Sequence, residues 1–311
     1  MHHHLVLGAG PVGSGVATEL AARGMPVTVV TRSGSGPAHE LITRVKADAA
    51  DTDAITRLAD GADTVFNCIN PPYHRWDTDW PPAHQSLLTA AEKTGAVLVM
   101  MDNLYAFGPG RPMPMREHDP MLATGTKGAM RARMAEDLLA AHADGRVRAT
   151  LARASDFYGP EVLGASLGER VMPNVLVGKK VSVLGSLDQP HSVSYMPDVV
   201  RTLVTIATDA RAWGSAWHVP NAPALTQRES IAALAAAAGT TVKVGTVPSV
   251  ALTTLGMFNP TMKALKEVLY QFEEPWITDS TLTEQTFGLR ATPFADGAAA
   301  TVAWWRRRNA G

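Results

Sequence analysis

The chain has 311 residues, of which 46% are hydrophobic, so it can bury one large core, alone or with a small appendage. Its net charge of -1 and scattered basic residues exclude the positive surface that nucleic-acid binding requires. Its one cysteine, Cys68, excludes an internal disulfide framework and fits a reducing cytoplasm. Because no apolar run has membrane-spanning length and no signal peptide precedes the first strand, we expect a cytoplasmic protein without a membrane partner.

Segments rich in Val, Leu and Ile alternate with helical patterns through the first half, which is typical of right-handed βαβ units in a parallel sheet. The expected strands are residues 4–8, 26–31, 43–47, 63–68, 96–101 and 147–153. Besides the helix that follows the first strand, the expected helices are residues 53–59, 81–95, 124–143 and 228–238. Pro81 and Pro82 suit the first turn of their helix, and Gly95 suits its end.

This alternation predicts an α/β fold with a Rossmann-type, doubly wound parallel sheet. The second half has fewer clean βα units and more prolines, which indicates a smaller C-terminal lobe that binds substrate. We expect residues 1–155 to form the dinucleotide-binding domain, which the chain rejoins at about residues 190–210. Residues 156–311 form mainly the smaller lobe.

A glycine turn links the first strand to the first helix. Gly8, Gly10 and Gly13 form a Gly-x-Gly-x-x-Gly pattern that Pro11 and Val12 complete. Gly8 suits a tight turn, Gly10 lets a phosphate approach the backbone, and Gly13 lets the helix pack on the strand. Because the helix also offers unpaired N–H groups and its positive end to an anion, the turn predicts binding of a dinucleotide pyrophosphate.

Residues after the next strands bear on the choice of dinucleotide. An acidic residue after the second strand binds a ribose hydroxyl, whereas arginine pairs with a 2'-phosphate. Arg32 stands there, which favours NADP over NAD, although a solvent-exposed loop arginine is the competing interpretation. Asp48, after the third strand, is a candidate acceptor for the adenine amino group or a turn residue. Asn67 ends the fourth strand and is expected near the adenosine ribose and pyrophosphate.

Later segments match the motifs of a known family in order. Phe107-Gly108 lies at a Tyr-Gly position, and Glu117-His118-Asp119-Pro120 follows in the next loop. Residues 153–160 are similar to Arg-Pro-x-Asn-x-Tyr-Gly-Pro, and residues 194–200 to His-Val-x-Asp-Val-Ala. With the glycine turn, most of the chain resembles the extended short-chain dehydrogenase/reductase superfamily, in particular its NAD(P)-dependent epimerase/dehydratase branch. The resemblance implies a cofactor-binding role for Asp156 near the nicotinamide, and a homodimer.

The family's chemistry uses a tyrosine and a lysine four residues apart on one helix face, where the lysine lowers the tyrosine pKa from about 10. Counting from Glu136 puts the lysine position at Ala132 and the tyrosine position at Gly128. A shifted register that uses Lys127 supplies no tyrosine either. The chain therefore resembles an atypical member, in which glycine at the tyrosine position is expected to leave room for substrate.

Other polar residues are candidates for the missing chemistry. Asp102 and Asn103 stand in place of the family's serine or threonine pair, at the carboxyl edge of the sheet where ligands bind. Tyr105 offers a phenol from another direction, and Arg131 offers a cation for a carboxylate or carbonyl oxygen. Tyr73 is expected as a polar contact in a pocket wall. For each, a buried structural hydrogen bond is the competing interpretation.

Together these features predict an NADP-dependent oxidoreductase, or a related isomerase or dehydratase, acting on a small organic substrate by hydride transfer. Protons would come from Tyr105, water or another non-standard donor. Loss of the tyrosine and lysine keeps a second hypothesis open, a catalytically inactive protein that senses the NADP(H) redox state and regulates a partner. The histidines lack metal-ligand spacing, so no metal is expected, and His2, His3 and His4 are interpreted as remains of a purification tag.

Overall fold

The computed structural model of the chain describes residues 3–247 and 264–310. Two compact units divide the chain. The first unit comprises Met1–Ala106, Pro120–Arg153 and Val199–Trp217, and the second comprises Phe107–Asp119, Ala154–Asp198 and His218–Gly311. Among the described residues, no helix combines the length and the apolar character needed to cross a membrane.

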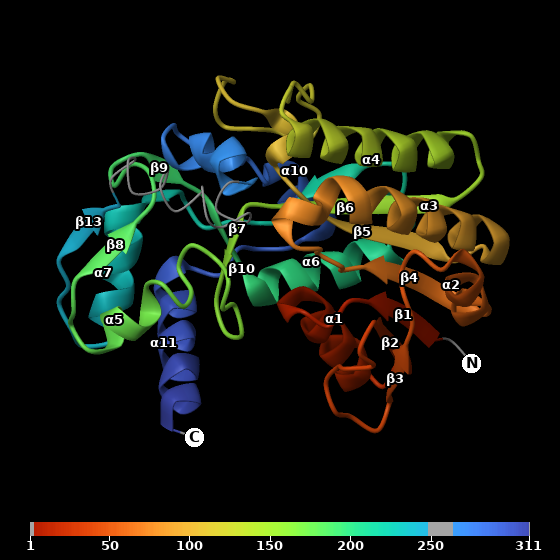
Figure 1. Cartoon of the computed structure of the whole chain (residues 1–311), viewed down its shortest axis with the longest axis horizontal. Coiled ribbons are helices and arrows are strands. Elements are labelled where there is room, and N and C mark those ends of the chain that lie inside the picture. Colours follow the sequence, from red (N-terminus) through yellow and green to blue (C-terminus); the bar gives the residue numbers. More distant parts are fainter. Residues whose placement is uncertain (1–2, 248–263, 311) are drawn as a thin grey trace. The chain divides into compact units, whose positions relative to one another are not determined.

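A seven-stranded sheet with the order β11-β6-β5-β4-β1-β2-β3 forms the centre of the first unit (Figure 1). Its strands are β1 (His3–Leu7), β2 (Val27–Thr31), β3 (Ile42–Lys46), β4 (Ala62–Asn67), β5 (Val97–Asn103), β6 (Arg148–Ala154) and β11 (Ala216–His218). The pairs β1/β2, β2/β3, β1/β4 and β4/β5 are parallel. The direction of strand order changes at β1, so the fold is a Rossmann-type α/β fold, whose ligand crevice lies beyond the carboxyl ends of β1 and β4.

Helices cover both faces of this sheet, as apolar parallel strands require. The helices are α1 (Pro11–Ala22), α2 (Thr52–Ala59), α3 (Trp76–Thr94), α4 (Thr126–Ala143) and α6 (Met196–Thr208). Figure 1 shows α3 and α4 over one face, with α1 and α6 over the other. Gly15 allows α1 and α6 to approach closely, because a Cβ on Gly15 would lie 2.6 Å from Cγ2 of Val200.

One sequence-based expectation for this unit was wrong. Helix α3 begins at Trp76 instead of Pro81, because the buried side chains of Trp76 and Trp80 extend its apolar face toward the N-terminus. Its expected end is confirmed, since Gly95 has a φ of 71° at the C-cap. Of the three histidines interpreted as tag residues, His3 and His4 belong to β1, where His4 is buried, and His2 lies outside the described residues.

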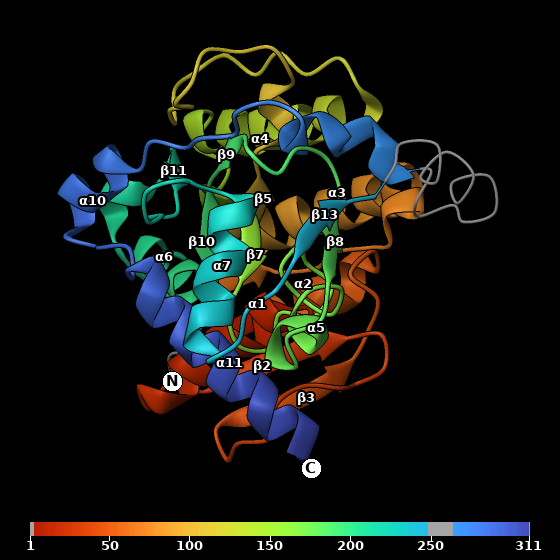
Figure 2. The same ribbon diagram turned by 90° about the vertical axis from the view of Figure 1, so that its left-hand side faces the viewer.

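The described part of the second unit contains three small two-stranded sheets. They pair β7 (Asp156–Tyr158) with β10 (Val193–Tyr195), β9 (Pro190–His191) with β12 (Leu225–Thr226), and β8 (Val181–Val183) with β13 (Val244–Thr246). The α-helices among these described residues are α5 (Met172–Leu176), α7 (Gln227–Ala237), α10 (Thr281–Phe287) and α11 (Phe294–Ala310). Helices α7 and α11 lie side by side (Figure 2), and Leu234 and Trp305 join them in one buried apolar cluster.

Candidate active site

The loop between β1 and α1 has the backbone geometry of a phosphate cradle. Gly8 adopts a φ of 97°, and a Cβ there would lie 2.7 Å from the carbonyl oxygen of Cys68. A Cβ on Gly13 would overlap the carbonyl oxygen of Gly8, whereas a Cβ on Gly10 would meet nothing within 4 Å. The loop is therefore closed against its neighbours at Gly8 and Gly13, while space remains at Gly10 for a ligand to approach the backbone.

The start of α1 leaves its amide groups available to an anion. Gly10 is the N-cap, and no side chain forms a capping hydrogen bond there. Pro11 occupies the first helical position, and buried Val12 anchors the turn. The uncapped N–H groups and the helix dipole suit a pyrophosphate. Beside this loop, burial raises the pKa of the Cys68 thiol to about 12, so the thiol is neutral and supplies no negative charge that would repel phosphate.

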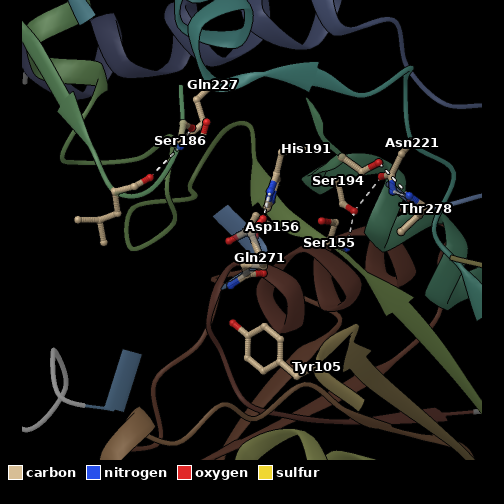
Figure 3. A network of polar contacts seen from close by, with 12 residues as sticks. Tyr105, Ser155, Asp156, Ser186, His191, Ser194, Asn221, Gln227, Gln271 and Thr278 are labelled. Atoms are coloured by element: carbon tan, nitrogen blue, oxygen red, sulfur yellow. Dashed lines mark hydrogen bonds and ion pairs between the residues drawn. The ribbon is translucent and has the colours of Figure 1, made fainter. Parts of the chain in front are cut away.

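The other predicted cofactor residues lie at strand ends. Arg32 is exposed directly after β2. Asp48 follows β3, and its Oδ1 accepts a hydrogen bond from the Ala50 N–H at 3.0 Å, which is the turn role left open above. Asn67 is the buried last residue of β4. Asp156 begins β7 in the second unit, where its Oδ2 lies 2.9 Å from Nε2 of His191 (Figure 3).

Two phenols meet in the first unit. Tyr105 begins a short 3-10 turn, Tyr105–Phe107, after β5, and its N–H donates to Oδ1 of Asn103 at 3.0 Å. The Tyr105 hydroxyl lies 2.7 Å from the hydroxyl of Tyr73. Tyr73 in turn stacks on Trp76, with ring centroids 4.8 Å apart and planes inclined by 20°. The two tyrosines therefore share a hydrogen bond within which a proton can pass between their oxygens.

A sealed charge cluster lies next to these phenols. Nη1 of Arg131 is 3.6 Å from Oδ1 of Asp102, and Nε of Arg153 is 3.4 Å from Oδ2 of the same carboxylate. The Asp102 side chain is 0% exposed and that of Arg131 is 5% exposed. Burial lowers the pKa of Arg131, whereas the charges of Asp102, Tyr73 and Tyr105 act in the opposite direction.

Arg131 is also held between two tryptophans. Its guanidinium carbon lies 4.8 Å from the ring centroid of Trp76 and 4.3 Å from that of Trp80. Such stacking suits the planar, weakly hydrated guanidinium. Arg131 thus points from α4 toward α3, and its position explains how a cation is tolerated in this buried place.

The expectation of free space at Gly128 was wrong. A Cβ on Gly128 would overlap the Cβ of Ala123 and lie 2.5 Å from the carbonyl oxygen of Tyr105. Glycine is required here because α4 packs directly against the Tyr105 backbone. The neighbouring Lys127 is buried, and Thr124 lies before the helix, which begins at Thr126.

Two contacts, one in each unit, were missed by sequence reasoning. Neither the stacking of Arg131 on Trp76 and Trp80 nor the contact between Asp156 and His191 follows a local spacing rule. The first depends on packing between α3 and α4, and the second joins residues 35 positions apart in the sequence. The only advance signals were the aromatic content of residues 73–80 and the presence of Asp at position 156 where the family motif has Asn.

The family of the chain follows from a direct comparison. The model of the NAD dependent epimerase/dehydratase family matches residues 4–219, which is most of the chain. The chain therefore belongs to this family. No curated protein matches it.

Solved structures of this architecture span nearly the whole chain. The dTDP-glucose 4,6-dehydratase from Streptomyces venezuelae, solved with NAD, has a TM-score of 0.79 at 20% identity and covers 99% of this chain and 98% of its own. The UDP-N-acetylglucosamine 4-epimerase from Methanobrevibacter ruminantium has a TM-score of 0.82 at 16% identity, covering 98% of both chains. The UDP-glucose 4-epimerase from Thermotoga maritima has a TM-score of 0.81 at 17% identity, covering 99% and 100%. At these identities the likeness establishes the fold.

Proposed function

We propose that this protein is an NAD(P)-dependent oxidoreductase that transfers hydride to or from a small organic substrate, at a carbonyl or an activated double bond. The observation that carries the proposal is the loop at Gly8, Gly10 and Gly13, which combines an open backbone with an uncapped helix start in a member of this family. Gly10, Pro11 and the first turn of α1 would hold the pyrophosphate.

Arg32 favours NADP over NAD as the cofactor. It is exposed directly after β2, and the following residues, Ser33 and Gly34, are not acidic. A guanidinium there can pair with a 2'-phosphate, whereas the chain lacks the carboxylate that would accept hydrogen bonds from a ribose diol at this position. Asn67 and Asp48 line the proposed path of the adenosine half.

Tyr105 is the proposed proton donor. When bound, the nicotinamide supplies or accepts the hydride. For reduction of a carbonyl, the Tyr105 O–H bond breaks as the substrate O–H bond forms, and the Tyr73 hydroxyl, 2.7 Å away, passes its proton to the Tyr105 phenolate. Water would then return a proton to Tyr73. The buried charge of Arg131 stabilises the phenolate, while Asp102 positions Arg131 and Asn103 positions the Tyr105 backbone.

Tyr105 with Arg131 would thus replace the tyrosine and lysine that the family places on α4. Because the Asp102 and Arg131 side chains are sealed, their proposed roles are positioning and electrostatic instead of proton transfer. The named solved relatives are nucleotide-sugar dehydratases and epimerases. Nucleotide sugars therefore belong in the first substrate panel, beside simple aldehydes, ketones and hydroxy ketones.

The test combines cofactor binding with turnover. Titration calorimetry of the purified full chain with NADPH, NADP, NADH and NAD should show binding, with preference for the phosphorylated pair. Absorbance at the NADPH band should then report oxidation in the presence of a carbonyl from the panel. Absence of both binding and turnover would exclude the proposed function.

A second candidate is a non-catalytic sensor of the NADP(H) redox state that regulates a partner. The tight packing at Gly128 favours it, because the family's tyrosine could not be accommodated there without moving α4. This hypothesis predicts different affinities for NADP and NADPH together with no turnover on any panel member. A Tyr105→Phe variant would then bind both forms as the wild type does.

A further inference from the structure

A tight turn directly follows β2 at the carboxyl edge of the sheet. The Gly34 N–H donates to the carbonyl oxygen of Thr31 at 3.2 Å, and Gly34 has a φ of 72°, which favours glycine. Arg32 and Ser33 are the two central residues of this turn, and both are exposed. The turn therefore presents one cation and one hydroxyl at the edge where ligands of this fold bind.

Lys46 lies directly beside this turn. It is the last residue of β3 and the register partner of Thr31, the last residue of β2. The Ala47 N–H donates to the carbonyl oxygen of Thr31 at 3.1 Å, so the two strand ends are held together. A Cβ on Gly34 would lie 3.5 Å from the Cβ of Lys46, which is ordinary van der Waals contact. The turn thus packs on the stem of Lys46, and the fold brings Lys46 and Arg32 to one edge.

Two serine hydroxyls share a hydrogen bond in the same loop. Oγ of Ser33 lies 2.8 Å from Oγ of Ser35, and the Thr31 hydroxyl donates to the Ser35 carbonyl oxygen at 3.0 Å, which closes the loop. Each serine hydroxyl has one hydrogen, and only one of the two hydrogens can lie between the oxygens. The other hydroxyl therefore keeps its hydrogen for a further acceptor. Because this hydroxyl already accepts a hydrogen bond, it is a stronger donor toward an anion.

Neither cation at this edge has a counter-charge in the described part of the chain. Among residues 3–247 and 264–310, Arg32 and Lys46 form no ion pair. Another exposed arginine of the same unit does form one, since Arg23 lies 2.6 Å from Glu19. The nearest carboxylate along the chain from Lys46 is Asp48, which accepts a hydrogen bond within its own turn. The edge therefore offers two uncompensated positive charges and a hydroxyl donor to an external anion.

The same edge of the sheet carries the glycine loop. Strands β1, β2 and β3 are neighbours and run parallel (Figure 1). The Gly8 N–H donates to the carbonyl oxygen of Val30 at 2.9 Å, so the glycine loop and the end of β2 are in direct contact. Neighbouring strands lie about 4.8 Å apart, which separates β1 from β3 by about 10 Å. One dinucleotide can therefore contact the glycine loop with its pyrophosphate and the turn after β2 with its adenosine ribose.

We propose that Lys46 and the paired hydroxyls of Ser33 and Ser35 are specificity-determining groups, which complete with Arg32 a site for a phosphate monoester on a ribose. The inference rests on the proposed function, because the ligand is the 2'-phosphate of the same cofactor. Two cations match the negative charge of a phosphate monoester, which approaches two at neutral pH, and the serine hydroxyl donates to one of its oxygens. A bare ribose hydroxyl would leave both cations without a counter-charge and would find no carboxylate after β2 to accept its hydrogen.

The test is titration calorimetry of the full chain with two adenosine bisphosphates that carry the same charge. Adenosine 2',5'-bisphosphate should bind about tenfold more tightly than adenosine 3',5'-bisphosphate, because only the 2'-phosphate reaches all three groups. Lys46→Ala should weaken binding of the 2'-phosphorylated probe and of NADPH about tenfold, with NADH affinity unchanged, whereas Lys46→Arg should retain most of the affinity. Ser33→Ala and Ser35→Ala should each weaken binding of both ligands about threefold.

Arg44→Ala is the matched control. Arg44 lies two residues before Lys46 on β3, faces the same side of the sheet and is also exposed. Its stem packs against Gly36, where a Cβ would lie 3.3 Å from Cγ of Arg44, so it stands farther from the carboxyl edge. Both variants remove one positive charge from β3, but only Lys46→Ala should reduce the preference for the 2'-phosphate. Circular dichroism and NADH affinity check that each variant folds.

Equal weakening of NADPH binding in Lys46→Ala and Arg44→Ala would overturn the site, because general loss of charge would then explain the effect. Equal affinity of the wild type for the two bisphosphates would overturn it as well. Wild-type NADPH affinity in Lys46→Ala, together with turnover of a panel substrate, would overturn the site and leave the proposed function intact. Selective binding of the 2'-phosphate by a wild type that turns over no substrate would support the site and count against the proposed hydride transfer.

Discussion

Asp102 and Asp156 each face a basic side chain, but their partners and their exposure to solvent differ. Asp102 lies between Arg131 and Arg153, and its side chain is 0% exposed. Asp156 faces His191, and its side chain is 20% exposed. Arginine remains charged under all ordinary conditions, whereas histidine and a carboxyl group can exchange a proton.

The difference shows that the charged partner of an acidic residue and its exposure together determine what the residue can do. Asp102 neutralises buried arginines that would otherwise be costly to bury, and no solvent path reaches it. Asp156 has a titratable partner and an open side, which are the two requirements for moving a proton to a ligand.

Replacement of Tyr105 by phenylalanine has the largest expected effect, because the proposal assigns the first proton transfer to this phenol and not to the sealed Asp102. The variant removes one hydroxyl and its hydrogen bond to Tyr73. We expect kcat with NADPH to fall by about 10² to 10⁴-fold, with little change in NADPH affinity. Tyr73→Phe is the matched control and should have a smaller effect on kcat. Equal losses in both variants would contradict the assignment of the donor to Tyr105.

Asp102→Asn is expected to affect stability before chemistry. It removes the negative charge that faces the buried guanidinium groups of Arg131 and Arg153. Urea unfolding should show a loss of about 3 kcal/mol or more, which is typical for removing one partner of a buried ion pair. Asp156→Asn should cost clearly less, because its carboxyl group is partly exposed. If the two variants lost the same stability, the contrast between the sealed and the open carboxylate would be wrong.

The sequence predicted those features that depend on short local patterns. The glycine loop could be located because Gly8, Gly10 and Gly13 each stand at a position of the strand-turn-helix unit where a side chain would be unfavourable. The strands were predicted nearly at their observed bounds, because each is a short apolar run between turn residues. The turn at Asp48 was likewise one of the two interpretations offered.

Features set by packing between distant elements could not be predicted in this way. The start of α3 was misplaced because Trp76 and Trp80 gain their burial from neighbours outside the local pattern. Gly128 was interpreted as open space, although the Tyr105 backbone fills it. Side-chain partners chosen by the fold, such as His191 for Asp156, have no spacing that a sequence pattern could detect.

Arg32 extends the comparison of buried and exposed charged residues to a cation at the surface. Unlike Arg131, it is exposed, so its removal should leave stability nearly unchanged. Arg32→Ala should weaken NADPH binding about tenfold, equivalent to about 1.4 kcal/mol, while NADH affinity stays the same. Calorimetry with both cofactors measures the change, and Arg44→Ala on neighbouring β3 is a control for general loss of positive charge. A parallel loss for NADH would show that Arg32 does not read the 2'-phosphate.

The smallest expected effect concerns acid sensitivity of the sealed cluster. His84 on α3 is buried, and desolvation lowers its pKa, with Arg131 acting in the same direction and Asp137 and Asp102 opposing. Below the ordinary histidine pKa of about 6.5, the unfolded chain binds this proton more readily than the folded chain. The contribution of His84 to stability is therefore present above that pH and is lost as pH falls below it. Urea unfolding of His84→Gln should depend less on pH between about 7 and 5 than the wild type does. The exposed His118, changed to Gln, should leave that dependence unaltered, and a flattening of the profile in this control would contradict the assignment to His84.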